Sequence, residues 1–179
     1  MKLSLINRFI KRSFDLLMAL FGISIFIWII IVAWMLSTIF HRKNGFFLQD
    51  RVGMNGKKFK IIKIRTMYED KFIFSTTTSL NDPRISIIGR FFRDYKIDEL
   101  PQLFNVLNGS MSFVGPRPDV EGFADMLKGD EKVILSLRPG ITGPATLKYK
   151  NEEHLLSKAT DVEEENKKIY RDKVRINLQ

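Results

Sequence analysis

The chain has 179 residues, a formal net charge of +9 at pH 7 and no cysteine. A chain of this length forms one domain. Without cysteine it has neither a disulfide framework nor a thiolate metal site, and its two histidines, far apart in sequence, argue against a zinc centre. The excess of Lys and Arg suits nucleic acid, anionic lipid and phosphorylated substrates equally well, so charge alone does not choose the partner.

An apolar segment near the start is the clearest feature of the chain. Residues 16–40 carry no charged side chain, and roughly 25 residues suffice to cross a hydrocarbon core of about 30 Å. The segment is too long for a signal peptide, and no small-residue cleavage site follows it. We therefore predict that residues 1–43 form a basic flank and a membrane helix, and that residues 44–179 form a separate soluble domain.

Both flanks of this segment are basic. Their cations are Arg8, Lys11, Arg12, Arg42 and Lys43. Because such charges are normally kept in the cytoplasm, a straight span places one flank on the disfavoured side. A re-entrant helix satisfies both flanks but requires a bend, for which Gly22 with Ser24 is the only weak point. Both topologies stay open, and the preference for positive charge on the cytoplasmic side favours the re-entrant one.

Residues 45–52 and 57–66 predict two strands of a hairpin, joined by a turn at Asn55-Gly56. In the second strand, alternation with period two places Lys63 and Arg65 on the same face. Two adjacent cations there suit a phosphate. The alternative is a solvated basic strand end.

Two further segments precede the most informative one. The Ser/Thr-rich residues 75–79 with Asn81-Asp82-Pro83 predict a loop and a turn. Residues 85–95 carry apolar side chains at helical spacing, and cations including Arg84 and Arg93 lie within or beside them. Such a helix either belongs to the core with a solvated basic edge or lies against anionic headgroups.

Residues 98–109 predict a short amphipathic helix. Its apolar positions, Leu100, Leu103, Phe104 and Leu107, follow the i, i+3, i+4, i+7 pattern. Asp98 stands at the expected N-cap, Pro101 in the first turn and Gly109 at the end. The helix thus starts with two adjacent carboxylates, Asp98 and Glu99. Capping and the helix dipole are the ordinary explanation for acids there, and catalysis is the alternative.

Two rigid loops, residues 114–118 and 138–144, each present an arginine among prolines and glycines: Arg117 and Arg138. A fixed arginine suits a phosphate ligand, and a structural turn with a solvated arginine is the alternative. From Asn151 onward the chain is rich in charge, which predicts solvated helices, and we assign no chemistry to them.

Together these segments resemble the bacterial sugar transferase family, the small monotopic phosphoglycosyl transferases that initiate glycoconjugate assembly on polyprenyl phosphate. The matching segments, in family order, are the basic-flanked apolar segment and residues 46–53 with Gly56, 63–67, 98–107, 115–118 and 138–143. Each is short, but the six occur in family order, and the match runs through most of the chain.

The resemblance implies a mixed α/β fold, in which a small soluble domain of helices surrounds a short β-hairpin or sheet after an N-terminal re-entrant membrane helix. It implies transfer of a phosphosugar from a UDP-sugar to polyprenyl (undecaprenyl) phosphate with release of UMP. It also implies a magnesium-dependent ping-pong reaction. By the same resemblance Asp98 is the nucleophile and Glu99 the residue associated with Mg²⁺. A carboxylate can attack phosphorus when a hard cation and arginines neutralise the diphosphate.

From the residues and the resemblance we expect substrate-binding cations at Lys63, Arg65, Arg84, Arg117 and Arg138. We expect the catalytic domain on the cytoplasmic face of the bacterial inner membrane. Three features differ from the family pattern. The family usually has a proline in the membrane segment, a glutamine and a Gly-Arg pair after the position of Gly143, and a further helical tail. This chain has no proline in residues 1–40, reads Pro-Ala-Thr-Leu-Lys-Tyr-Lys at 144–150 and ends at Gln179.

Two other readings stay open. One is a membrane-anchored transferase that acts by direct displacement, with Asp98 and Glu99 serving only as metal ligands. The other is a non-catalytic nucleotide-sugar binding module. A nucleic-acid binder is the weakest reading, because no nucleic-acid motif appears. The sequence identifies neither the sugar nor the polyprenol nor the oligomeric state.

Overall fold

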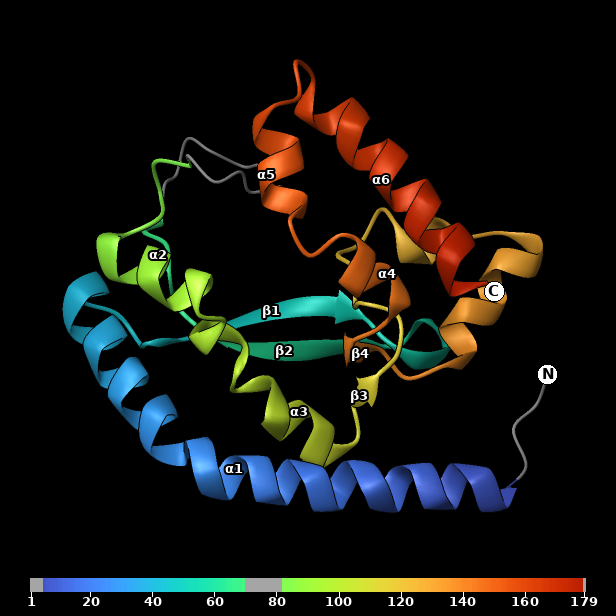
Figure 1. The fold of residues 1–179 in the computed structure, drawn as a ribbon, viewed down its shortest axis with the longest axis horizontal. Helices are drawn as coiled ribbons and strands as arrows, with labels where there is room; N and C mark the ends of the chain where they lie inside the picture. Colours follow the sequence, from blue (N-terminus) through green and yellow to red (C-terminus); the bar gives the residue numbers. More distant parts are fainter. Residues whose placement is uncertain (1–4, 70–81, 179) are drawn as a thin grey trace.

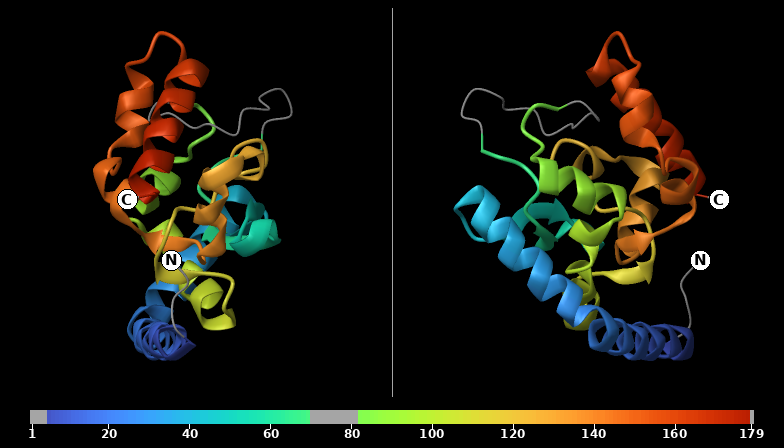
Figure 2. Two further views of the ribbon diagram at one scale, coloured as in Figure 1. Left: turned by 90° about the vertical axis from the view of Figure 1, so that its right-hand side faces the viewer. Right: turned by 60° about the vertical axis from the view of Figure 1, so that its left-hand side comes forward.

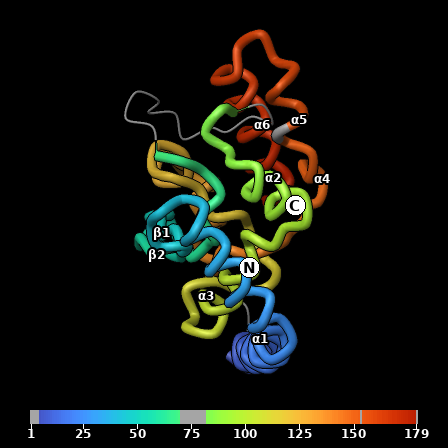
Figure 3. Tube along the Cα trace, turned by 90° about the vertical axis from the view of Figure 1, so that its left-hand side faces the viewer, coloured from blue at the N-terminus to red at the C-terminus, as the bar shows by residue number. Residues whose placement is uncertain are grey.

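The computed structural model describes residues 5–69 and 82–178. The Ser/Thr run at 75–79 and Asn81 lie outside the described residues. Helix α1, Leu5–His41, lies along one side of the molecule, and the helices α5, Glu152–Ser157, and α6, Val162–Asn177, lie at the opposite side (Figure 1). The remaining elements lie between them (Figures 2 and 3). This is the mixed α/β fold predicted from the sequence.

Helix α1 is long and apolar enough to cross a membrane. Large apolar side chains such as Leu17, Phe21 and Trp28 are exposed on it, which suits a lipid environment. The helix bends part-way along its length (Figure 1). The Ser24 hydroxyl donates to the Leu20 carbonyl at 2.9 Å, a contact that often bends helices, and Gly22 nearby carries no side chain.

The first half of α1 is held to the domain by polar contacts. The Arg12 guanidinium donates to the carbonyls of Val106 and Leu107, at 2.6 and 2.9 Å. Asp15, which is 1% exposed, accepts hydrogen bonds from Lys11 Nζ at 2.5 Å and from Ser112 Oγ at 2.9 Å. A buried carboxylate is tolerated only with such partners, so this end of the helix is fixed in place.

The last turns of α1 are also held to the domain. The Ser37 hydroxyl donates to the Arg65 carbonyl at 2.7 Å, and the Gly45 N–H donates to Thr38 Oγ1 at 3.0 Å. Between the two ends, the small residues Ala19 and Ala33 are buried against the domain core. Both ends of α1 therefore contact the same domain.

The hairpin predicted from the Asn-Gly turn is confirmed. Strand β1, Phe46–Val52, pairs antiparallel with β2, Lys58–Ile64, through the turn η1, Met54–Gly56. Asn55 and Gly56 have φ of 57° and 74°, the left-handed region that these residues tolerate. Strand β2 ends two residues before the predicted end, because the Thr66 carbonyl turns away to accept the Ser86 N–H at 3.0 Å.

Helix α2, Ile87–Asp94, begins at Ser86, whose side chain accepts from the Gly89 N–H. The apolar stripe predicted for it divides between two environments. Phe92 is buried with Ile64 and Ala33, and Ile88 packs on the same cluster. Ile87 is 92% exposed and Phe91 is also exposed. Only part of the stripe therefore belongs to the core.

The predicted helix start at Asp98 is wrong. Residues Ile97–Glu99 form the 3-10 turn η2, and helix α3 covers Gln102–Asn108. Lys96 adopts the left-handed region at φ 56°, which redirects the chain, and the Asp98 side chain makes no capping hydrogen bond. Pro101, which lacks an N–H, stands directly before α3. The predicted end at Gly109 is confirmed, at φ 87°.

The two arginine loops are joined by a short parallel pair, β3, Ser112–Val114, and β4, Gly140–Thr142. The loops approach so closely that a Cβ on Gly140 would stand 2.2 Å from the Gly115 nitrogen. Between them lie the 3-10 helices η3, Ala124–Met126, and η4, Gly129–Ser136. The short helix α4, Pro144–Lys148, follows β4. The glycines thus fix the position of the loop that carries Arg117.

Candidate active site

Glu99 lies at the centre of a cluster of charges. Lys63 Nζ, from β2, and Arg117 Nη2, from the loop after β3, both donate to Glu99 Oε1 at 3.0 Å. Burial alone raises the pKa of Glu99, but the two cations outweigh burial and hold the pKa well below its usual range. Glu99 is therefore ionised at any physiological pH. Neither bond uses Oε2, and no residue that the structure describes donates a hydrogen bond to that oxygen.

Asp98, one residue earlier, has a different environment. It is 6% exposed, and its Oδ1 is buried without a hydrogen-bond partner. Burial raises the pKa of Asp98 to about 6, against the opposing effect of Lys63. A buried carboxylate without partners is unfavourable for folding, and such groups concentrate at functional sites.

Asp98 and Glu99 both border a polar cavity of about 210 Å³, here called the polar pocket. Its walls carry the cations Arg51, Lys63, Arg93, Lys96, Arg117 and Lys173. Four carboxylates also border the pocket, those of Asp98, Glu99, Asp119 and Glu152. The excess of cations over carboxylates suits a highly anionic ligand.

The polar pocket contains residues that sequence reasoning missed. Asp119 follows the Arg117 loop, and burial raises its pKa to about 6, against the effect of Lys173 and Arg51. Tyr170 and Lys173 come from α6, in the tail to which no chemistry was assigned. A sequence pattern could have indicated these residues. Tyr170 stands four residues before the buried Val174, a helical spacing that marks a packed face of the tail helix.

A second, larger cavity adjoins the polar pocket on the side of α1. It has a volume of about 680 Å³, and we call it the apolar groove. Met18, Phe21 and Ile25 of α1 form one wall, and Leu100, Leu103 and Phe113 of the domain form another. An apolar channel that opens along a long helix with exposed apolar side chains suits a lipid chain.

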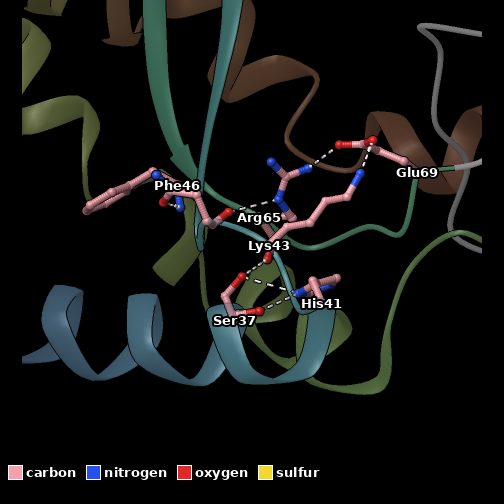
Figure 4. Close-up of polar contacts among 7 residues, drawn as sticks. Ser37, His41, Lys43, Phe46, Arg65 and Glu69 are labelled. Carbon is pink, nitrogen blue, oxygen red and sulfur yellow. Dashed lines mark hydrogen bonds and ion pairs between the residues drawn. The ribbon is translucent and has the colours of Figure 1, made fainter.

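The predicted substrate-binding cations fall into two groups. Lys63 and Arg117 meet at Glu99, as described above. Arg65 points elsewhere: it donates to the Asn44 carbonyl and to Glu69, which also pairs with Lys43 (Figure 4). Arg84 binds Asp82 at 2.6 Å. The other three cations, Arg65, Arg84 and Arg138, border neither the polar pocket nor the apolar groove. A role for them in substrate binding stays a prediction.

Comparison with known proteins gives a consistent result. The family model described as "Bacterial sugar transferase" matches residues 6–177. The chain belongs to this family. Its relatives include the "UDP-galactose-lipid carrier transferase" of Erwinia amylovora, 37% identical over 156 residues, which are 76% of this chain and 32% of that protein. The "Exopolysaccharide production protein ExoY" of Rhizobium meliloti is 36% identical over 74% of this chain and 66% of its own length.

A third relative is the "Putative undecaprenyl-phosphate N-acetylgalactosaminyl 1-phosphate transferase" of Bacillus subtilis. It is 40% identical over 122 residues, which are 68% of each chain. This bacterial sugar transferase thus spans about a third of the length of the Erwinia relative and about two thirds of the other two. The family predicted from the order of the motifs is confirmed.

The oxygen donors of the site can be compared with the ligands that Mg²⁺ prefers. Among the described residues, no group of three or more His, Cys, Asp or Glu side chains is arranged so that it could hold a metal ion. In phosphoryl transfer, however, Mg²⁺ needs only one or two carboxylates, since substrate phosphates and water complete its six ligands. Glu99 Oε2 is a hard oxygen donor that no described residue engages, and Glu99 borders the polar pocket, so this residue fits such an ion.

Proposed function

We propose that this chain transfers a phosphosugar from a UDP-sugar to polyprenyl phosphate, with undecaprenyl phosphate as the acceptor and UMP as the product released. The observation that carries the proposal is the position of Asp98, a buried carboxylate with an unpaired oxygen, in a pocket of cations that adjoins an apolar groove beside α1. The relatives named as lipid-carrier and undecaprenyl-phosphate transferases support it.

In the first step, an Asp98 carboxylate oxygen attacks the phosphorus that bears the sugar. A bond from this oxygen to phosphorus forms, and the bond from phosphorus to the bridging oxygen of the diphosphate breaks. UMP leaves with the electron pair, and an aspartyl-phosphosugar remains. Burial supports this role, because a poorly solvated carboxylate is more reactive than a hydrated one and is held in one position.

In the second step, an oxygen of the polyprenyl phosphate attacks the same phosphorus. The bond to Asp98 breaks, and the carboxylate is regenerated. The product is a polyprenyl diphosphate sugar, and no oxidant, reductant or additional proton donor is required. Two displacements at one phosphorus imply ping-pong kinetics.

Mg²⁺ supplies charge neutralisation for the diphosphate when it is bound. Glu99 Oε2 is the oxygen that would hold it, and Asp98 keeps the separate role of nucleophile. Lys63 and Arg117 keep Glu99 ionised, and they place two further positive charges beside the polar pocket. Arg117 also presents a planar fork that matches phosphate oxygens.

The topology proposed with this function is a re-entrant α1, with both ends on the cytoplasmic face of the bacterial inner membrane. Its support is the contact of both ends with one domain, through Arg12 and Asp15 at one end and Ser37 at the other. A straight span would draw one set of these contacts across the bilayer. The basic residues near both ends agree with cytoplasmic placement.

The test is a turnover assay with purified protein, undecaprenyl phosphate and a panel of UDP-sugars. We expect UMP release from at least one donor, loss of release in excess chelator, and no release by Asp98→Asn. Substitution of an exposed acid, Glu121→Gln, is the matched control and should retain the wild-type rate. Absence of UMP with every donor would refute the proposed function, and full activity of Asp98→Asn would refute the assigned nucleophile.

A further inference from the structure

The polar pocket and the apolar groove share a boundary. Five of the described residues border both cavities, and we call them the junction: Lys96, Glu99, Arg117, Glu152 and Lys173. Any ligand with an apolar chain in the groove and a reacting group near Asp98 must pass between these side chains. The junction therefore determines how a ligand held in the groove reaches the nucleophile.

Two ion pairs form most of the junction. Arg117 binds Glu99 at 3.0 Å, and Lys173 binds Glu152 at 2.6 Å. The side chains of Lys173 and Glu152 are 14% and 24% exposed, so solvent only partly screens this pair. The fifth member, Lys96, is exposed, and its side chain forms no ion pair within the described part of the chain.

The two ion pairs differ in whether the cation can leave its carboxylate without disturbing the surroundings of Asp98. Glu99 holds both Lys63 and Arg117, so removal of Arg117 would weaken the arrangement beside Asp98. Lys173 belongs to a separate unit: it comes from α6, its partner Glu152 begins α5, and its Nζ stands 5.8 Å from the centre of the Tyr149 ring. Lys173 can leave Glu152 for another anion without disturbing Glu99.

We propose that Lys173 and Lys96 bind the phosphate of the polyprenyl acceptor at the junction, and that Lys173 exchanges Glu152 for this phosphate. The inference rests on the proposed function and adds the acceptor-phosphate subsite to it. The isoprenoid chain lies in the apolar groove, whose walls along α1 are apolar side chains such as Met18 and Phe21. A phosphate carried there needs cations, because burial of an unpaired anion is highly unfavourable.

Lys96 is a cation whose backbone lies at the entry to the turn that carries the nucleophile. It stands two residues before Asp98 and adopts the left-handed region at φ 56°, a conformation that costs free energy for a residue with a side chain. This conformation directs the chain into the turn that carries Asp98. Lys150 also borders the groove but not the polar pocket, so it lies outside the junction.

The ion pair between Lys173 and Glu152 offers a test in which the two partners have opposite effects. Lys173→Gln removes a ligand of the acceptor phosphate, so the KM for undecaprenyl phosphate should rise about tenfold or more, as expected for loss of a charge-assisted hydrogen bond. Glu152→Gln removes the competitor of that phosphate, so the same KM should fall. Lys173→Arg keeps the charge and should restore most of the affinity.

The donor reaction provides the second measurement. In both variants the KM for the UDP-sugar should change less than the KM for undecaprenyl phosphate, because Lys63 and Arg117 remain in place beside the nucleophile. Lys96→Gln should behave as Lys173→Gln does. Lys168→Gln, on the solvent side of α6 and paired with Glu164, is the matched control and should change neither KM. Thermal unfolding of each variant verifies that it is folded.

Two results would overturn the inference. A rise in the KM for the donor, with that for the acceptor unchanged, would assign Lys173 to the nucleotide sugar. A change of the acceptor KM in the same direction for Lys173→Gln and Glu152→Gln would make the pair structural. If no donor yields UMP, the proposed function fails instead. Binding of undecaprenyl phosphate to Asp98→Asn with and without Lys173→Gln, measured in micelles, then still tests the subsite.

Discussion

Asp98 and Glu99 are neighbours in sequence, yet one has a buried oxygen without a partner while the other binds two cations through one oxygen. The 3-10 turn η2 separates their environments, because successive residues in such a turn point about 120° apart. The consequence is a division of labour between two carboxylates. The pKa of Asp98 is raised to about 6 by burial, and that of Glu99 is held low by Lys63 and Arg117.

The first prediction concerns the pH dependence of the donor reaction. The nucleophile must be ionised, so kcat/KM for the UDP-sugar should rise with pH through about 6, the pKa of Asp98, and level off above about pH 7. Release of UMP under single-turnover conditions, followed between about pH 5 and about pH 8, measures this profile. A rate independent of pH over this range would contradict the role of burial at Asp98.

The second prediction concerns the stability of Asp98→Asn. The pKa of Asp98 is raised from 3.8 to about 6 on folding, so the folded state binds the proton more tightly. Wild-type stability should therefore fall as the pH rises from about 4 through about 6, whereas the variant lacks this loss. Above about pH 7 the variant should be more stable by about 3 kcal/mol, the equivalent of that pKa difference. An equal free energy of unfolding for wild type and Asp98→Asn at all pH values would contradict this prediction. Thermal or denaturant unfolding in detergent at several pH values is the measurement.

The third prediction concerns the geometry of Arg117. Its guanidinium binds Glu99 and borders both cavities, and the ammonium of lysine cannot reproduce its planar fork. Arg117→Lys should lower kcat/KM about tenfold or more, although the charge is kept. The control is Arg171→Lys on the exposed face of α6, which should leave the rate unchanged. A near wild-type rate for Arg117→Lys would make Arg117 a structural residue.

The fourth prediction concerns topology. The chain has no cysteine, so single cysteines can be placed at Asn7 and Lys57, both exposed. A re-entrant α1 puts both on the cytoplasmic side. Neither should react with a membrane-impermeant thiol reagent in intact spheroplasts, and both should react after permeabilisation. Labelling of the Asn7 position alone in intact spheroplasts would establish a straight span.

Much of the scaffold follows from local sequence. The hairpin follows from Asn55-Gly56, and the end of α3 from Gly109, because few other residues accept positive φ at such positions. The family follows from the order of its motifs. The predicted helix start at Asp98 was wrong because residues Ile97–Glu99 form a separate 3-10 turn and α3 begins only after Pro101. No local pattern announced this turn.

The composition of the site depends on long-range packing. Lys63 and Glu99 meet across 36 positions of sequence, and Lys173 reaches the same region from the last helix. Period-two alternation placed Arg65 beside Lys63, but β2 ends at Ile64, and beyond that point the alternation no longer applies. Arg65 therefore turns to Glu69 (Figure 4). Such contacts depend on the tertiary fold, which local periodicity does not specify.

The covalent step is the central claim, and intact-mass spectrometry tests it most directly. Wild-type protein mixed with a productive UDP-sugar, without acceptor, should gain the mass of one phosphosugar and release one equivalent of UMP. Undecaprenyl phosphate should then return the protein to its original mass. Asp98→Asn should fold and gain nothing. An unmodified wild-type mass, with UMP appearing only after the acceptor is added, would contradict the account and support direct displacement.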